Sequence, residues 1–163
     1  MFIKITAILV AFISIPALCD DWVQETDVKN HVSQKNDNSQ TGVSGYARIY
    51  VDDESCQKLV LLNLRDVSGE SFNFDTLIIN GTWVRVNQFG TDVLGITYYN
   101  AASPEGQVFI LNEFRTKKEV AVKTSEMNAL TIFSATGFSK ALKSQNSRVK
   151  KCIEDRQSKA TAL

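Results

Sequence analysis

The chain has little of what metal-dependent and nucleophilic chemistry requires, because its 163 residues include one histidine, His31, and three cysteines. A metal site or a Ser-His-Asp arrangement would have to use a histidine in a polar stretch with no second histidine or cysteine nearby. The sequence contains no CxxC pair, glycine-rich phosphate loop or dinucleotide fingerprint. The acidic cluster at residues 52–54 lacks the alternating spacing and the glycine of a calcium loop. We therefore expect no catalytic residues, no metal, no cofactor and no enzymatic activity.

An excess of charge of one sign is also absent, since 18 Lys and Arg residues balance 18 Asp and Glu residues. Without a basic stripe the chain does not fit nucleic acid as a partner, and it has no basic amphipathic helix for a membrane surface. The longest apolar run, residues 5–15, is about half the roughly 20 residues that a membrane-spanning helix needs. We expect neither a nucleic-acid partner nor stable membrane insertion of the mature chain.

The N-terminus has the pattern of a secretory signal. Lys4 precedes the apolar run, Pro16 interrupts it, and Cys19 stands directly before an acidic pair. The sequence predicts that residues 1–19 are a cleaved, helical Sec-type signal and that the mature protein is periplasmic or secreted. A lipoprotein modified at Cys19 is the alternative, although Leu18 occupies the position where such a site requires a small residue.

Cleavage at this point leaves two cysteines, Cys56 and Cys152, in the mature chain. In an oxidising compartment we expect them to form one disulfide. The bond would close a loop of about a hundred residues, which the chain-entropy model values at roughly 4–5 kcal/mol. This separation suits a structural crosslink rather than a redox-active pair.

Patterns typical of β-strands dominate the chain from residue 46 onward. Residues 46–51 and 58–64 predict two strands joined by a turn. Within residues 76–86, two strand-like runs flank Asn80-Gly81, a pair that tolerates the positive φ angles of a type I′ hairpin turn. Asn80 also begins a formal glycosylation sequon, which we interpret as incidental to the turn. Further strands are predicted at residues 93–99, 107–111, 119–124 and 129–135.

Residues 139–151 are the one segment with good helical composition, with Phe138, Leu142 and Val149 as its expected buried stripe. Many strands followed by a late helix predict a mainly β fold, an antiparallel β-sandwich or flattened barrel with one C-terminal α-helix. We divide the chain into the signal peptide (1–19), a polar N-terminal segment (20–45), the β-sandwich domain with its helix (46–152) and a polar tail (153–163). Trp22 is expected to act as an anchor or short edge strand ahead of a connection.

Several features occur in a characteristic order: an early Trp22, Cys56 at the start of a strand, the hairpin at residues 77–85, and residues 131–142 followed by Cys152. In this order the chain resembles small exported β-sandwich proteins of the invasion-associated locus B type, and especially the related two-cysteine periplasmic proteins found near type VI secretion systems. The locus B pattern usually has further cysteines, which this chain lacks. The resemblance implies the β-sandwich fold, the disulfide, and a role as an accessory protein of the bacterial envelope.

Aromatic residues are the remaining candidates for a partner-binding surface. Trp83, Phe89, Tyr98 and Tyr99 lie on or beside adjacent predicted hairpins, and those not needed in the core could form an exposed patch. Tyr98 and Tyr99 are consecutive in a strand and must point to opposite faces, so we expect one of them to point outward. Trp83 is expected to lie in the core.

The sequence thus predicts an exported, non-enzymatic accessory protein that binds another envelope or secreted protein. An inhibitor or immunity protein against a secreted toxin or lysozyme is one alternative, with residues 88–92 and 100–106 as candidate protruding loops. A subunit of a larger assembly is another. A cell-wall hydrolase is a further alternative, which the single histidine disfavours.

Overall fold

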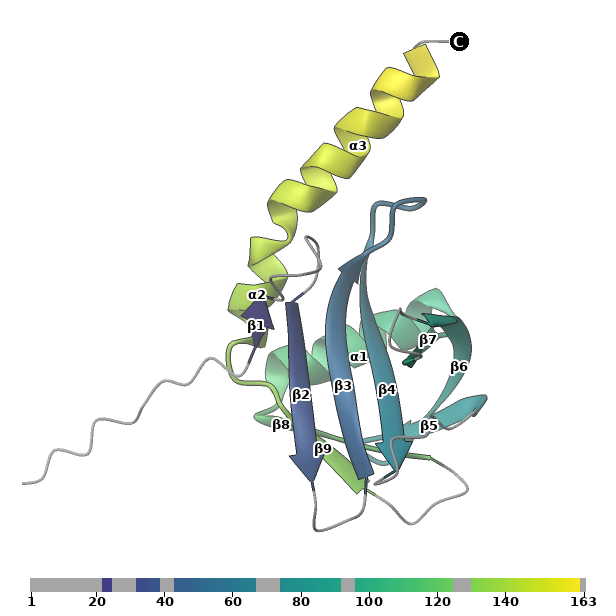
Figure 1. Ribbon diagram of the computed structural model, residues 1–163, viewed down its shortest axis with the longest axis vertical. Coiled ribbons are helices and arrows are strands. Elements are labelled where there is room, and N and C mark those ends of the chain that lie inside the picture. Colours follow the sequence, from purple (N-terminus) through teal and green to yellow (C-terminus); the bar gives the residue numbers. More distant parts are fainter. Residues whose placement is uncertain are drawn as a thin grey trace, which may run out of the picture.

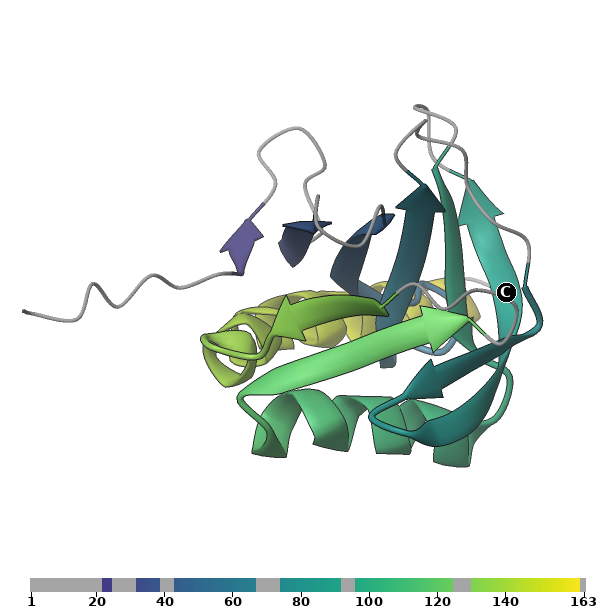
Figure 2. The same cartoon turned by 90° about the horizontal axis from the view of Figure 1, so that it is seen from below.

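The structure, a computed structural model, describes residues 22–24, 32–38, 43–66, 74–91, 96–124 and 130–161. Within these ranges nine strands pair in the order β1-β2-β3-β4-β7-β6-β5-β8-β9, with antiparallel neighbours throughout. The sheet curls strongly around one side of helix α1 (Figure 1, Figure 2), and β9 comes close to β2 and β3. The prediction of a mainly β, antiparallel, barrel-like fold with a C-terminal helix is confirmed.

The strands are β1 (Val23–Gln24), β2 (Val32–Asn38), β3 (Val43–Val51), β4 (Lys58–Asp66), β5 (Thr76–Ile79), β6 (Thr82–Thr91), β7 (Thr97–Ala101), β8 (Glu119–Thr124) and β9 (Leu130–Ser134). The helices are α1 (Pro104–Thr116), α2 (Phe138–Ser144) and α3 (Asn146–Thr161). The predicted strands at residues 46–51, 58–64, 119–124 and 129–135 therefore correspond to β3, β4, β8 and β9. The strand predicted at residues 93–99 appears as β7, which begins at Thr97, and residues 92–95 lie outside the described ranges.

The hairpin of β5 and β6 confirms the expectation from Asn80-Gly81, since both residues have positive φ angles, 46° and 85°. A type I′ turn requires this conformation at both central positions. The turn fixes the register in which Leu77 faces Val84 and Ile78 faces Trp83. Leu77 and Val84 point into the core, whereas Trp83 points outward.

The strand predicted at residues 107–111 is wrong, because these residues belong to α1. Ser103 caps the helix, with its Oγ accepting a hydrogen bond from the Gly106 N–H at 3.1 Å, and Pro104 occupies the first turn. Ile110 and Phe114 lie one turn apart on the same helix face and are each 1% exposed. In a helix, residues four apart lie on the same face, so both side chains reach the core together. Their burial favours the helix over the predicted strand.

The core fills the space between the inner face of the curved sheet and α1. Its largest fully buried side chains are Phe114, Phe133, Phe138, Ile49, Leu62, Leu64, Leu77, Ile79 and Ile110. A smaller apolar cluster of Leu61, Ile96 and Tyr98 lies on the opposite face of the sheet. The sheet is therefore covered on its inner face and partly covered on its outer face.

The N-terminal segment contributes to the sheet. Trp22 is 6% exposed, and its Nε1–H donates a hydrogen bond to the Ser134 carbonyl of β9 at 3.2 Å. Its ring meets Phe114 and Phe138 edge to face, with centroids 5.6 and 5.0 Å apart. The predicted anchor is thus found, but β2 pairs along β3 where the sequence predicts a connection. Main-chain pairing does not need an apolar pattern, so this strand gave no clear sequence signal.

The helical prediction for residues 139–151 covers parts of two helices, α2 and α3, which meet at Gln145. Phe138 is fully buried, and Leu142 and Val149 are half-buried. α3 continues to Thr161, through the segment expected to be a polar tail. None of its residues, all of which are described, is buried, and Figure 1 shows it projecting away from the sheet.

Candidate functional site

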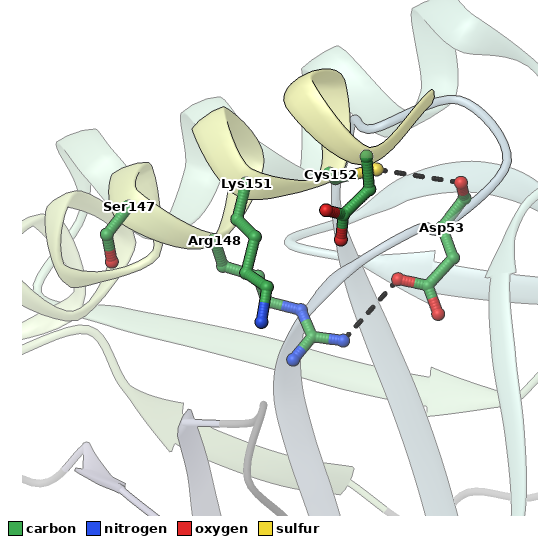
Figure 3. Close-up of a pocket in the computed structure, with 6 residues that line it drawn as sticks. Asp53, Ser147, Arg148, Lys151 and Cys152 are labelled. Atoms are coloured by element: carbon green, nitrogen blue, oxygen red, sulfur yellow. Dashed lines mark hydrogen bonds and ion pairs between the residues drawn. The ribbon is translucent and has the colours of Figure 1, made fainter. Parts of the chain in front are cut away.

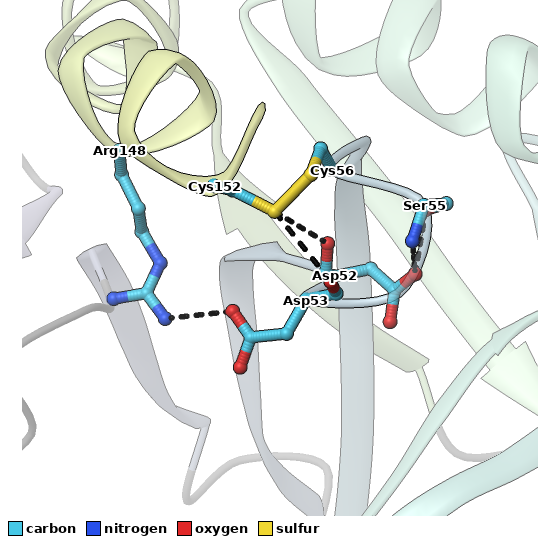
Figure 4. Close-up of polar contacts among 6 residues, drawn as sticks. All are labelled: Asp52, Asp53, Ser55, Cys56, Arg148 and Cys152. Carbon is cyan, nitrogen blue, oxygen red and sulfur yellow. Dashed lines mark hydrogen bonds and ion pairs between the residues drawn. A yellow bond between two sulfur atoms is a disulfide. The ribbon is translucent and has the colours of Figure 1, made fainter. Parts of the chain in front are cut away.

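Cys56 and Cys152 form the expected disulfide, with Cα atoms 5.7 Å apart, and join the turn between β3 and β4 to α3 (Figure 4). The turn places Cys56 in the left-handed region, with φ of 56°, and the Cys56 N–H donates to the Asp52 carbonyl at 2.7 Å. The Asp52 carboxylate accepts hydrogen bonds from the Ser55 N–H at 2.7 Å and the Ser55 hydroxyl at 2.5 Å. These contacts hold Cys56 in position to meet the helix.

A charged hollow of about 420 Å³ lies beside the disulfide (Figure 3). Arg148 and Lys151 from α3 line it together with Asp53 and Asp155, and Arg148 Nη2 lies 3.5 Å from Asp53 Oδ1. The Cys152 Sγ lies 3.5 Å from the Asp53 carbonyl oxygen, a contact without a proton because the sulfur is in a disulfide. Two basic and two acidic side chains leave no net charge for an ionic ligand. We assign the hollow to the attachment of α3.

The acidic cluster at residues 52–54 gains no support as a metal site from the geometry of the described part of the chain. Within those ranges no group of three His, Cys, Asp or Glu side chains is placed to hold a metal ion. Asp52 of the acidic cluster is engaged by Ser55, whose hydroxyl hydrogen bond holds the pKa of the Asp52 carboxyl below its ordinary value. His31 and Cys19 lie outside the described residues. A separate finding is that no helix in the described ranges has the length and apolar character needed to cross a bilayer.

The structure separates the four aromatic residues predicted for a partner surface. Tyr98 and Tyr99 point to opposite faces as predicted, but each is 3% exposed, so neither is available at the surface. Tyr99 belongs to the main core, and Tyr98 lies on the outer face beneath the Arg48 guanidinium, 4.4 Å from the ring centroid. Phe89 is 37% exposed and packs edge to face on Tyr50, with centroids 5.0 Å apart.

Trp83 is the one member of this set that is largely exposed. It presents 63% of its surface to solvent, so the expectation that it lies in the core is wrong. The cross-strand register explains this, because the inward pair Leu77 and Val84 forces the next pair, Ile78 and Trp83, to the outer face.

Trp83 stands beside a groove of about 670 Å³ between the N-terminal end of β6 and the first turns of α1. We call it the edge groove, and its lining comprises residues 82–85, Ala102, Ser103, Glu105, Gly106 and Phe109. One wall is a strand edge with the exposed indole, and the other is a helix with the half-buried Phe109. Both apolar rings and main-chain groups are thus available in one concave surface.

Specific contacts hold both walls of the edge groove in place. At Gly106 an added Cβ would lie 3.0 Å from the Ala101 Cβ and 3.5 Å from Val84 Cγ1, so α1 packs tightly beneath β6. At the hairpin tip, the Asn80 Nδ2 donates to Glu113 Oε2 of α1 at 2.6 Å. The Asn80 Oδ1 accepts from the Ala121 N–H of β8 at 2.9 Å. Asn80 therefore links the hairpin to both neighbouring elements.

Sequence reasoning missed this groove because it assigned its helical wall to a strand. The available signal was local: Ser103-Pro104-Glu105 combines a capping residue, a first-turn proline and a first-turn acid. The candidate inhibitory loops are also corrected. Of residues 88–92, the first four belong to β6 and Asp92 lies outside the described ranges, and residues 100–106 span the end of β7 and the start of α1. Neither forms a protruding loop in the part of the chain that is described.

Comparison of the chain with protein-family models, with curated proteins and with solved structures finds no match.

Proposed function

We propose that this chain is an exported, non-enzymatic accessory protein of the bacterial envelope that binds a partner protein through the edge groove. The resemblance to two-cysteine periplasmic proteins suggests the setting. The observation that carries the proposal is Trp83, 63% exposed at the rim of a groove with two firmly held walls.

An exposed tryptophan lacks the large stabilisation that burial of its side chain would give the folded protein. Full burial of a large apolar side chain stabilises by roughly 1.5–3 kcal/mol, and tryptophan is enriched among the residues that dominate protein interfaces. On the outer face the indole continues into a cross-strand row formed by Ile78, Lys123 and Leu130. Ile78 and Leu130 are half-buried. A partner that covers Trp83 would therefore gain apolar contact area beyond the groove itself.

The disulfide supports export, because such bonds persist in oxidising compartments. Together with the signal pattern of residues 1–19, it favours a periplasmic or secreted mature protein. Mass spectrometry of the full chain expressed in bacteria, with a C-terminal tag, tests this step. We expect a mass that corresponds to cleavage near Cys19, without lipid.

The binding proposal is tested by pull-down of the tagged protein from envelope and secreted fractions of the source bacterium. Trp83→Ala is the test variant. Val108→Ala is the matched control, because Val108 is 56% exposed on α1 but does not line the groove. We expect one protein to be retained at fixed stoichiometry by the wild type and the control and to be lost with Trp83→Ala. Identical retention by all three, or retention of nothing, would overturn the proposal.

A further inference from the structure

We infer that the edge groove binds an extended peptide segment, which adds to the sheet as a strand alongside the N-terminal end of β6. This inference rests on the proposed function and specifies the kind of partner. Three observations support it: the unpaired main-chain groups of Trp83, the first turns of α1 as the opposite wall of the groove, and the positive charge of Arg85 beside Trp83.

The pairing of β6 leaves main-chain groups of Trp83 directed into the groove. The Val86 N–H donates to the Asp75 carbonyl at 2.8 Å, so alternate residues of β6, including Val84, direct their main-chain groups toward the β5 side. Trp83 and Arg85 consequently direct theirs to the other edge. There the Arg85 carbonyl accepts from the Ala102 N–H at 2.9 Å. Beyond that bond, no strand in the described ranges pairs with β6 at Trp83.

Pro104 explains why the pairing between β6 and β7 stops before Trp83. β7 pairs with β6 from Val86 opposite Ala101, and the same register would place Trp83 opposite Pro104. Proline has no N–H to donate, and here it starts α1 instead of extending β7. The chain therefore turns away under the sheet and leaves the N–H and carbonyl of Trp83 available to another strand.

The helix α1, which lies opposite the edge of β6, limits which kind of molecule can bind in the groove. A second folded copy would have to bring a sheet edge into a space bounded by the first turns of α1, where Ser103, Glu105 and Phe109 stand. A groove of about 670 Å³ between these walls accommodates one extended segment. Peptides that add to a sheet edge obtain affinity from main-chain hydrogen bonds and specificity from alternate side chains.

The side chains around the groove specify the sequence of such a peptide. Trp83 and Arg85 are two residues apart, so both point to the outer face, and both are exposed. No carboxylate in the described ranges pairs with Arg85. Because Ala102 already occupies the position opposite Arg85, the added strand begins opposite Trp83. An acidic residue at that position would reach Arg85 diagonally, and an apolar residue two positions further along the added strand, toward the hairpin turn, would pack on Trp83 from the other diagonal. We therefore expect a peptide with an apolar and an acidic residue at this spacing.

The test uses a library of random linear peptides, displayed on phage and selected on the full tagged protein, with counter-selection on Trp83→Ala. Strand addition predicts enriched peptides with the apolar and acidic pair. In synthetic versions, N-methylation at the position opposite Trp83 should weaken binding by roughly tenfold, because that amide loses its hydrogen bond to Trp83 and the methyl group keeps it away from the strand edge. N-methylation at the two adjacent positions, whose amides point away from β6, should leave affinity unchanged. Because this change is made in the peptide, a loss of binding cannot result from misfolding of the protein.

A charge exchange tests the specificity. Arg85→Glu should weaken binding of the acidic peptide by about two- to fivefold, and replacement of the acidic residue by lysine should restore it. The inference is overturned if no enriched peptide depends on Trp83, if both sets of N-methyl groups act alike, or if the exchange does not restore binding. In any of these cases, a Trp83-dependent partner in the pull-down would still support the proposed function. A pull-down without such a partner would overturn the proposed function itself.

Discussion

Gly45 of β3 occupies a position where neighbouring strands leave no room for a side chain. An added Cβ would lie 2.7 Å from the Asn63 carbonyl oxygen and 2.9 Å from Cζ of Phe133 in β9. We predict that Gly45→Ala lowers the free energy of unfolding by about 1–3 kcal/mol, because backbone and a fully buried ring would have to shift. Urea denaturation measures this. Gly90→Ala is the control, since nothing lies within 4 Å of its added Cβ; equal losses for both variants would contradict the packing argument.

Asp52 gives the β3–β4 turn a dependence on pH. The hydrogen bond from the Ser55 hydroxyl holds the pKa of Asp52 below its ordinary value of 3.8 in the folded protein. The stabilisation is therefore fully present above the ordinary pKa and is lost as the pH falls through the lowered one. We predict that the stability difference between wild type and Asp52→Asn shrinks below about pH 4. Ser55→Ala should remove most of this pH dependence, and a difference that stays constant down to pH 2 would contradict it.

At the scale of elements, prediction succeeded where local chemistry decides the structure. Asn80-Gly81 fixes a hairpin by itself, and the disulfide follows from a count of cysteines. The hairpin register could also have placed Trp83 outside, since the facing runs put Leu77 and Val84 on one side and Ile78 and Trp83 on the other.

Prediction failed where tertiary contacts or main-chain pairing decide. Residues 107–111 have apolar side chains that suit a strand, yet the Ser103 cap and the burial of Ile110 and Phe114 make them helical. β2 forms through pairing with β3 in a polar sequence. The edge groove needs both α1 and the N-terminal end of β6, so no single segment of the sequence could reveal it.

Helix α3 is held to the body by a few contacts between Asn146 and Arg156, next to a further contact on α2. Besides the disulfide, Arg156 donates to the Glu54 carbonyl, and Lys58 Nζ donates to the Leu142 carbonyl at 2.8 Å and to the Asn146 side chain. We predict that reduction of the disulfide releases α3, because none of its residues is buried. Hydrogen exchange should then accelerate at residues 146–161. Amides of α1 are the control, because Phe114 anchors that helix in the core; an unchanged α3 would contradict the prediction.

For the whole molecule, the disulfide crosslinks residues 96 positions apart and encloses most of the sheet. Closing so long a loop restricts the unfolded chain far more than the folded one. We predict that Cys56→Ser lowers the free energy of unfolding by about 2–5 kcal/mol. Chemical denaturation without reductant measures the loss, and Cys152→Ser should give the same value. A midpoint equal to that of the wild type would show that the crosslink does not restrain the unfolded state.

Trp22 connects the N-terminal segment to the opposite end of the sheet, because it packs on α1 and α2 and bonds to β9. The N-terminal segment should therefore unfold together with the rest of the molecule. The two tryptophans allow this to be measured, since Trp22 is 6% exposed and Trp83 is 63% exposed. In Trp83→Phe, fluorescence reports on Trp22 alone.

We predict that the Trp22 emission of Trp83→Phe shifts to longer wavelength at the same denaturant concentration at which the far-ultraviolet circular dichroism of the sheet is lost. Trp22→Phe, which leaves Trp83 as the reporter, should show only a small shift, because that indole is in water before and after unfolding. Trp22→Ala should lower the free energy of unfolding by about 3–5 kcal/mol, since it removes a buried ring and leaves the Ser134 carbonyl without its donor. If the emission instead shifted at lower denaturant than the circular dichroism, the N-terminal segment would be a separately docked strap, and the sheet would be stable without it.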